Sequence, residues 1–321
     1  NEIRHALLTK LSAHGGHIGP NLGMVEATIA LHYVFNSPVD KIVYDVSHQS
    51  YAHKMLTGRK DAFLHAEEYD EVTGYTNPQE SKHDFFTIGH TSTSVSLACG
   101  LAKARDLKRG RENIIAVIGD GSLSGGEAYE GLSNAGETGT NLIVVVNDNE
   151  MSIAENHGGL YQNLKALRDS DGQTPCNFFK SLARDYIYVK DGNDITALIH
   201  AFTQVKDIPR PVVVHIHTLK GKGYTLAETY KERFHWGMPF NLETGQPLSD
   251  GGNTEDYCNL TGKFLLEQMQ KDPTVVAISS GTPAVIGFNP ERRQQAGNIL
   301  CNRDIQRFYF VTASILFHYL T

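Results

Sequence analysis

Two polar residues follow two apolar runs of the sequence, at places where they could hold a divalent cation. The run 114–118 leads into Asp120, and the run 142–146 leads into Asn149. Short apolar runs bounded by glycine and asparagine are typical of buried parallel strands. Parallel strands end at a common edge of the sheet, where ligands bind in open α/β proteins. Because a carboxylate and an amide oxygen suit Mg²⁺, the sequence predicts a magnesium site at Asp120 and Asn149.

The turn after Asp120 has the composition of a phosphate-binding segment. Gly121 allows the backbone to approach a ligand closely, and Ser122 adds a hydroxyl group. A helix predicted over 125–135 would direct its positive N-terminal end toward an anion. The alternative is that Asp120 caps a helix and Asn149 is a turn residue. Their matching places at two strand ends favour a diphosphate held through magnesium.

Two histidines lie in loops close to the first predicted helix and strand. His17 belongs to a segment with four glycines in ten residues, and His48 follows a short predicted strand. A single histidine in a loop is ordinarily a surface or hydrogen-bonding residue. His32 falls within a predicted helix and is expected to be structural, and no catalytic task is assigned to His53.

Apolar strands and amphipathic helices alternate along the chain, which predicts an α/β fold with a doubly wound, mostly parallel sheet. We expect a first domain at 1–240, a linker at 241–256 and the start of a second α/β domain at 257–321. The predicted strands are 42–46, 114–118, 142–146, 186–189, 211–217 and 275–279. The predicted helices are 2–12, 25–35, 95–107, 125–135, 160–167, 178–182, 195–205 and 258–270.

Composition indicates a globular chain without a polyanionic partner. Of 321 residues, 40% are hydrophobic and 20% charged, and the net charge of −7 disfavours nucleic acid and anionic membranes. A phosphorylated substrate must therefore meet local positive charge. No apolar run approaches the ~20 residues of a membrane span. Four cysteines without paired spacing are expected to be free thiols in the cytoplasm. Because the sequence opens inside a helix without methionine, we expect it to be trimmed.

Several short motifs narrow the interpretation of the magnesium site. They are His-Gly-Gly-His at 14–17, Asp-Val-Ser-His-Gln at 45–49, Gly-His-Thr-Ser-Thr-Ser at 89–94, Gly-Asp-Gly at 119–121, Asn-Asp-Asn at 147–149 and Lys-Gly-Lys-Gly-Tyr at 220–224. Together and in this order they resemble the 1-deoxy-D-xylulose-5-phosphate synthases, transketolase-like enzymes that use thiamine diphosphate. The resemblance extends from residue 1 to about residue 288.

The resemblance implies a reaction, cofactors and site residues. The reaction condenses pyruvate with D-glyceraldehyde 3-phosphate, with loss of CO₂, and uses thiamine diphosphate and Mg²⁺ in a cytoplasmic homodimer. The residues implied to act on the reacting carbons are His17, His48 and His235. The implied magnesium ligands are Asp120, Asn149 and the carbonyl of Met151. The residues implied to contact the cofactor are His48, Gly89, His90, Thr91, Gly121, Ser122, Asn149, Met151 and Lys220.

The sequence also departs from this family pattern. Pro20 and Ser47 stand where serine and glycine are expected, and no glutamate follows Glu291 where the family has one that contacts the cofactor's pyrimidine ring. The chain is expected to be a gapped view of a longer protein, an N-terminal subunit with a separate partner, or a protein that binds the cofactor without turnover. A transketolase acting on ketose phosphates is the enzymatic alternative.

Overall fold

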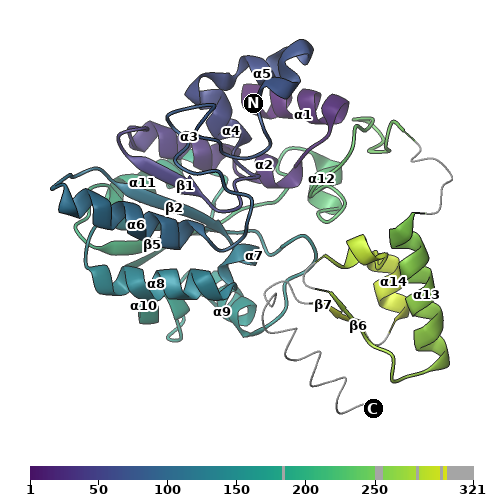
Figure 1. Cartoon of the computed structure of the whole chain (residues 1–321). Coiled ribbons are helices and arrows are strands. Elements are labelled where there is room, and N and C mark those ends of the chain that lie inside the picture. The colour runs from purple at the N-terminus through teal and green to yellow at the C-terminus, as the bar shows by residue number, and fades with distance from the viewer. Residues whose placement is uncertain (183–184, 250–255, 280–281, 297–298, 302–321) are drawn as a thin grey trace. The chain divides into compact units, whose positions relative to one another are not determined.

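The computed structural model describes residues 1–182, 185–249, 256–279, 282–296 and 299–301 (Figure 1). These residues form two compact units. Unit 1 comprises 1–151 and 158–248, and unit 2 comprises 152–157 and the described residues from 249 onward. The tail at 302–321, which was included in the predicted second domain, lies outside the described residues.

Unit 1 is built on a parallel sheet of five strands in the order β1-β2-β3-β5-β4. The strands are β1 (Lys41–Tyr44), β2 (Ile114–Gly119), β3 (Leu142–Asp148), β4 (Asp185–Val189) and β5 (Pro211–His217). Each coincides with a predicted strand to within two residues at either end. The central strand, β3, is buried along its whole length, as its uninterrupted apolar run predicts.

Helices cover both faces of this sheet (Figure 1). One face packs against α3 (Val25–Val34) and α11 (Ile195–Val205). The other packs against α6 (Ser94–Leu107), α8 (Gly126–Thr138), α9 (Gly159–Asp169) and α10 (Phe178–Leu182). Along β2, Ile115 and Val117 face the first layer, whereas Ile114, Ala116 and Ile118 face the second. This alternation confirms the predicted doubly wound α/β fold.

A third apolar cluster joins the N-terminal segments to the end of unit 1. It involves α1 (Glu2–His14), α2 (Gly19–Gly23), α4 (Tyr51–Lys54), α5 (Asp61–Leu64) and α12 (Thr225–Thr229). Two further turns of helix, η1 (Met55–Arg59) and η2 (Ala66–Glu71), lie between them in sequence. No helix or strand is predicted within segment 60–88, but α5 and η2 give it regular structure because Phe63 and Tyr69 bury their rings.

The end of unit 1 includes residues expected to belong to a linker. Phe240 forms an antiparallel bridge with Pro247, and the Tyr224 hydroxyl donates to the carbonyl of Leu242 at 2.9 Å. The Arg233 guanidinium donates to the carbonyl of Gly245 at 2.7 Å. Residues 241–248 are therefore folded onto unit 1, while the domain limits 1–240 and 257–321 stay a prediction.

Unit 2 contains α13 (Tyr257–Lys271), β6 (Ala277–Ser279), η3 (Pro283–Ile286), α14 (Pro290–Gln295) and β7 (Ile299–Cys301). The predicted helix at 258–270 and strand at 275–279 are confirmed by α13 and β6, and β6 pairs with β7 in parallel. The Asp256 side chain caps α13 by accepting a hydrogen bond from the Asn259 N–H at 2.6 Å.

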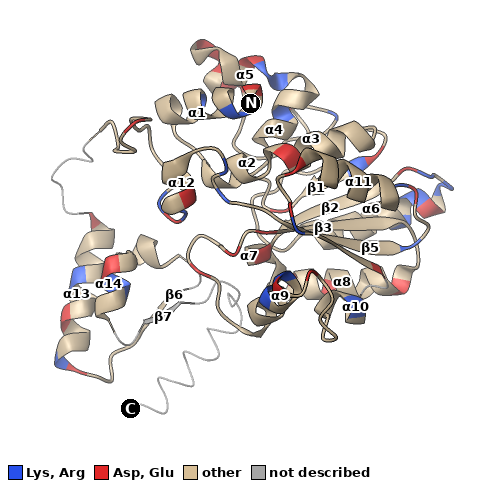
Figure 2. Cartoon of the chain, turned by 180° about the vertical axis from the view of Figure 1, so that it is seen from behind, with Lys and Arg blue, Asp and Glu red and all other residues tan. Residues whose placement is uncertain are grey.

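The described residues carry mixed surface charge and free cysteines. Acidic and basic residues are interspersed along the outer helices (Figure 2). Within the described parts of the chain, no helix has the length and apolar character needed to cross a membrane. Cys99, Cys176 and Cys258 are free thiols, as expected, whereas the side chain of Cys301 lies outside the description.

A buried polar network fastens segment 73–84 to α4 and η1. The Asp84 carboxylate accepts a hydrogen bond from His53 at 3.0 Å and two from Arg59, at 2.7 and 3.0 Å. Lys54, which is fully buried, forms an ion pair with Glu80. His53 also contacts His32 through their ring nitrogens, at 2.8 Å. The structural role expected of His32 is thus confirmed, and His53 shares it.

Candidate active site

Asp120 and Asn149 lie just beyond the same end of two neighbouring strands. Gly119 of β2 pairs in register with Asn147 of β3. Asp120 follows directly as the first residue of a short helix, α7 (Asp120–Leu123), and Asn149 follows the end of β3. Both residues are at least nine-tenths buried. The placement predicted from the two apolar runs is therefore the one observed.

The oxygen atoms at these strand ends are of the chemical types that bind magnesium. Gly119 rather than Asp120 is the N-cap of α7, so the alternative capping role of Asp120 is wrong. The Asn149 side-chain oxygen accepts a 3.3 Å hydrogen bond from the Met151 N–H, so Asn149 also stabilises its own turn. Among the described residues no group of three or more His, Cys, Asp and Glu could hold a metal. The Asp120 carboxylate, the Asn149 amide and the Met151 carbonyl form a ligand set of another kind. Such a set would suit a Mg²⁺ ion that keeps phosphate and water ligands.

The turn that carries Asn149 is fixed by buried partners of the preceding residue, Asp148. Arg168 and His215 donate to its carboxylate at 2.5 and 3.0 Å. Burial alone would raise the pKa of this carboxyl, but the His215 hydrogen bond and the Arg168 charge bring the pKa below its ordinary value. The other nitrogen of His215 lies 2.8 Å from the Tyr186 hydroxyl. Asp148 is therefore an ionised anchor for the end of β3.

The loop with Gly89, His90 and Thr91 is held against the turn that follows Asp120. The Asp45 carboxylate accepts hydrogen bonds from the backbone N–H groups of Ser92 and Ser94, at 2.8 and 2.9 Å. The Ser92 hydroxyl donates to the carbonyl of Ser122 at 2.7 Å. A Cβ on Gly125 would lie 2.0 Å from the Ser92 oxygen, so this approach requires glycine.

Asp45 is a site-building residue that the sequence analysis passed over. It directly follows β1, as Asp120 follows β2, and it is almost completely buried. The argument from strand ends that identified Asp120 and Asn149 applies equally to Asp45. Each of its carboxylate oxygens accepts a hydrogen bond from a backbone N–H of the loop, so Asp45 orients that loop.

The three predicted histidines meet in one cluster. The ring centroid of His17 lies 4.8 Å from that of His48 and 5.6 Å from that of His235, and the last two rings are 5.3 Å apart. They come from three separate segments of the chain, after α1, β1 and α12. The sequence spacing of these histidines does not predict the cluster, because His235 lies 187 positions after His48.

Two contacts between distant parts of the sequence position the histidine cluster. The Asn21 amide donates to the carbonyls of His17 and His48, both at 2.8 Å, and accepts from the Tyr51 N–H at 2.9 Å. Gly16 and Gly237 form an antiparallel bridge that brings the segment of His235 to that of His17. Asn21 is fully buried and is a positioning residue that the sequence analysis missed.

Lys220 lies close enough to His17 to affect its ionisation. The pKa of His17 is lowered to about 4, first by burial and then by the positive charge of Lys220. Lys220 is 1% exposed, and a Cβ on Gly19 would lie 3.3 Å from its side chain. His17 is therefore uncharged near neutral pH, and a buried cation stands beside it.

Replacing Lys220 by methionine should raise the pKa of His17, because one of the two causes of its depression is removed. The pKa should stay below 6.5, since burial still disfavours the charged imidazole. Histidine-selective ¹³C NMR measured from pH 3 to 8 reports this pKa directly. Lys103→Met, at an exposed site on α6, is the matched control and should leave it unchanged. An unchanged His17 pKa in Lys220→Met would show that the two groups do not interact.

Ser47, the residue found where the family pattern led us to expect glycine, adopts a positive φ of 67°. Its hydroxyl donates to the carbonyl of Ile88 at 2.7 Å and accepts from the Thr76 N–H at 2.9 Å. These bonds join the turn before His48 to both ends of segment 76–88. Glycine adopts a positive φ more readily than serine does. At Ser47 two tertiary hydrogen bonds stabilise this backbone conformation.

Ser47→Ala should reduce the free energy of unfolding by about 2 kcal/mol, because the buried N–H of Thr76 loses its acceptor. Urea unfolding followed by circular dichroism measures this change. Ser133→Ala, at an exposed position of α8, should change stability by less than about 0.5 kcal/mol. A loss at Ser47 no larger than that of the control would contradict the assigned role of the hydroxyl.

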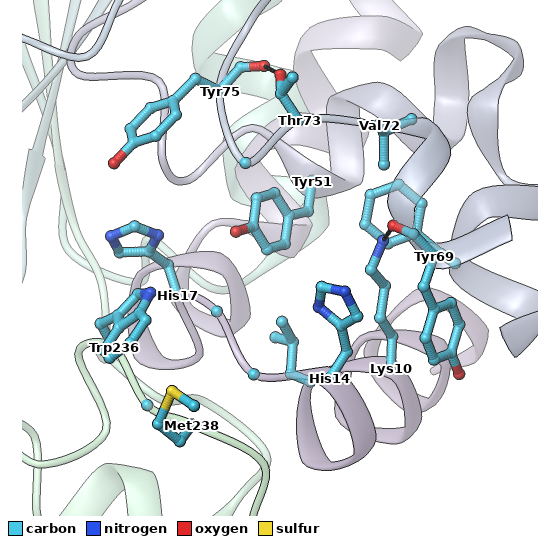
Figure 3. A pocket seen from close by; sticks show the side chains of 16 residues that line it. Lys10, His14, His17, Tyr51, Tyr69, Val72, Thr73, Tyr75, Trp236 and Met238 are labelled. Carbon is cyan, nitrogen blue, oxygen red and sulfur yellow. Dashed lines mark hydrogen bonds between the residues drawn. The ribbon is translucent and has the colours of Figure 1, made fainter. Parts of the chain in front are cut away.

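A pocket of about 250 Å³ lies next to His17 (Figure 3). Aromatic rings form much of its wall, and the hydroxyl groups of Tyr51 and Tyr75 point toward His17. Trp236 and Met238, both more than half exposed, also line it. The histidine cluster therefore borders a small space that can hold part of a ligand.

Comparisons with known proteins agree with these features. A family model described as 1-deoxy-D-xylulose-5-phosphate synthase matches residues 1–174 and 169–218. The chain is 41% identical to the 1-deoxy-D-xylulose-5-phosphate synthase of Alkaliphilus oremlandii over 90% of its own length and 52% of that protein. It is also 41% identical to the synthase of Caldanaerobacter subterraneus, over 89% of the chain and 52% of the relative. The chain spans about half the length of these curated relatives.

Solved transketolases share the fold. The enzyme of Campylobacter jejuni superposes with a TM-score of 0.58 at 20% identity, covering 84% of this chain and 41% of that one. A transketolase variant of Pichia stipitis gives the same TM-score at 17% identity, covering 95% of this chain and 60% of the other. At such identities the likeness concerns the fold alone. The match to the family model, which extends over more than half of the chain, shows that the chain belongs to the 1-deoxy-D-xylulose-5-phosphate synthase family.

Proposed function

We propose that this chain is the diphosphate- and magnesium-binding portion of a transferase that condenses pyruvate with D-glyceraldehyde 3-phosphate. The products are 1-deoxy-D-xylulose 5-phosphate and CO₂. The main support is that Asp120 and Asn149 lie at the adjoining ends of β2 and β3 in a chain that belongs to the synthase family. Thiamine diphosphate, when bound, supplies the carbanion chemistry that the condensation needs.

The residues at the strand ends would hold the cofactor's charged group. Asp120, Asn149 and the carbonyl of Met151 are the proposed ligands of Mg²⁺, which neutralises the diphosphate. Gly121 and Ser122 lie in α7 next to this position, and the loop with Gly89, His90 and Thr91 packs beside them. Lys220 adds a buried positive charge for a phosphate oxygen.

The histidine cluster would hold and exchange protons with the reacting molecules. Because the pKa of His17 is about 4, its imidazole is neutral at pH 7 and can both accept and donate a hydrogen bond. His48 and His235 lie within 6 Å of it, ring centroid to ring centroid. Three imidazoles around one small space can orient a carbonyl group and exchange its proton.

Two other functions remain distinct hypotheses. A transketolase acting on ketose phosphates would share this fold and cofactor, but the solved transketolases support only the fold. A non-catalytic subunit that binds the cofactor and requires a C-terminal partner is motivated by the absence of a glutamate after Glu291. We place the protein in the cytoplasm as a homodimer that acts on small molecules, without a nucleic-acid or membrane partner.

The proposal is tested with the purified protein, thiamine diphosphate and Mg²⁺. We expect CO₂ release from ¹⁴C-labelled pyruvate that depends on glyceraldehyde 3-phosphate, with a 1-deoxyketose phosphate as the product. Transfer of a two-carbon unit from xylulose 5-phosphate without use of pyruvate would establish the transketolase alternative. Cofactor binding without either turnover, restored by adding a C-terminal partner chain, would establish the subunit alternative.

A further inference from the structure

The pocket beside His17 contains a buried positive charge that the proposed chemistry does not use. Lys10 lies on α1 between the buried residues Leu7 and Leu11, and it is only 5% exposed. Its ammonium group donates hydrogen bonds to the carbonyls of Ala62 and Tyr69, both at 2.8 Å. The same group lies 4.4 Å from the ring centroid of Phe63. These contacts fix its position at the pocket wall (Figure 3).

The contacts of Lys10 leave it able to bind an anion. An ammonium group has three N–H donors, and backbone carbonyls accept two of them. No aspartate or glutamate is among the described residues that line the pocket. The nearby carboxylates are engaged elsewhere, Asp70 with His14 at 2.7 Å and Glu80 with Lys54 and Arg59. A buried cation that donates to neutral carbonyls rather than to a carboxylate favours a ligand that supplies negative charge.

The remaining walls suit a small, hydroxylated molecule. Tyr51 and Tyr75 present phenol groups, and His14 lies on the same side of the pocket as Lys10 (Figure 3). Aromatic faces and hydroxyl groups together bind short polyhydroxylated chains through apolar contact and hydrogen bonds. At about 250 Å³, the pocket is smaller than the ~300–1,000 Å³ that is typical of drug-sized ligands.

We propose that this pocket binds a small phosphorylated hydroxy compound, with the phosphate group at Lys10 and the carbon chain extending toward His17. The net charge of −7 offers such a ligand little general attraction, so a local cation is needed. The ligand has two candidate sources, the acceptor of the proposed reaction or a separate phosphorylated effector. Binding of the acceptor rests on the proposed function, whereas binding of a separate effector does not.

The test uses the full-length protein and sn-glycerol 3-phosphate, which carries the phosphate but no aldehyde. Isothermal titration calorimetry should show at least tenfold weaker binding to Lys10→Met than to the wild type. Lys103→Met, an exposed lysine on α6, is the matched control and should bind as the wild type does. Glycerol, without the phosphate, should not distinguish the proteins. Equal affinity of Lys10→Met and wild type for glycerol 3-phosphate would overturn the proposal.

A second measurement does not depend on the folding of a variant. Burial lowers the pKa of Lys10 to about 8, against the raising effect of Asp70 and Glu80 and with a further lowering by Lys54. Glycerol 3-phosphate is a dianion throughout pH 7–9.5, because its second pKa is about 6. Wild-type affinity should therefore fall as the pH rises through 8 and the ammonium loses its proton. Affinity that stays constant from pH 7 to 9.5 would contradict a role for Lys10.

Steady-state kinetics distinguish binding of the acceptor from binding of a separate effector. Inhibition by glycerol 3-phosphate that is competitive with glyceraldehyde 3-phosphate, together with a raised acceptor KM in Lys10→Met, would assign the pocket to the acceptor. Inhibition that is not relieved by the acceptor would assign it to an effector. If the protein shows no turnover, the proposed function fails, but calorimetry with Lys10→Met still decides the pocket.

Discussion

Asp120→Ala is expected to abolish magnesium-dependent binding of thiamine diphosphate, with at least a ~100-fold loss of affinity. Asp120 is the only carboxylate in the proposed ligand set, and without it the ion would be held by the Asn149 amide and a carbonyl alone. The loss should exceed the ~10–100-fold effect usual for residues that only support metal ligands. Trp236, the single tryptophan of the chain, follows His235 directly, so its fluorescence offers a binding signal.

Controls separate loss of the metal ligand from loss of the fold. Glu137→Ala removes an exposed carboxylate from α8 and should bind the cofactor as the wild type does. In Asp120→Ala, raising the Mg²⁺ concentration should recover part of the affinity, whereas a misfolded variant would not respond. Affinity equal to that of the wild type at low Mg²⁺ would show that the metal site lies elsewhere.

Asp84→Ala should reduce the free energy of unfolding by about 3–5 kcal/mol, the usual effect of removing one partner from a buried ion pair. The side chain is fully buried, and its removal leaves Arg59 and His53 without their principal acceptor. The Asn77 N–H, 2.8 Å from the carboxylate, also loses its acceptor. Urea unfolding measures the change. Glu130→Ala, at an exposed position of α8, should differ from the wild type by less than about 0.5 kcal/mol.

The effect of Asp84 should also depend on pH. Burial by itself raises the pKa of this carboxyl, but hydrogen bonds from His53, Arg59 and the Asn77 N–H bring the pKa well below its ordinary value. A depressed carboxyl pKa stabilises the fold at pH values above the unfolded pKa of about 3.9. The stability difference between wild type and Asp84→Ala should therefore be constant near neutral pH and shrink as the pH falls below about 4. A difference that grows on acidification would contradict the ionised state of Asp84.

The sheet and its ligand edge were predictable because the signals are local. Each strand is a short apolar run, and the residues after two of those runs, Asp120 and Asn149, are positioned by strand geometry alone. The helices that flank the strands also have local signals, such as the apolar spacing of α11. The predicted strands and helices therefore match observed ones to within a few residues at their ends, whereas short helices such as α5 and η2 are missed.

The surroundings of the site depend on contacts between distant residues, and these were not predictable. Asn21 reaches the carbonyl of His48, 27 positions away, and Lys10 reaches that of Tyr69, 59 positions away. Arg59 and Asp84 meet where no helix or strand is predicted, because polar pairs rather than apolar periodicity stabilise this part of the chain. A local signal did exist for Lys10, since a lysine three positions after Leu7 falls on the buried side of its helix.

The central position of β3 has a consequence for the order in which parts of the molecule open. β3 is bonded to β2 on one side and β5 on the other, and all seven of its residues are buried. Its amide protons should therefore exchange with solvent only through global unfolding, whereas those of η2, at the pocket wall, should exchange through local opening. Asn149 directly follows the end of β3, whereas Lys10 donates to the Tyr69 carbonyl of η2. The pocket wall should therefore open many times while the proposed metal ligands stay in place.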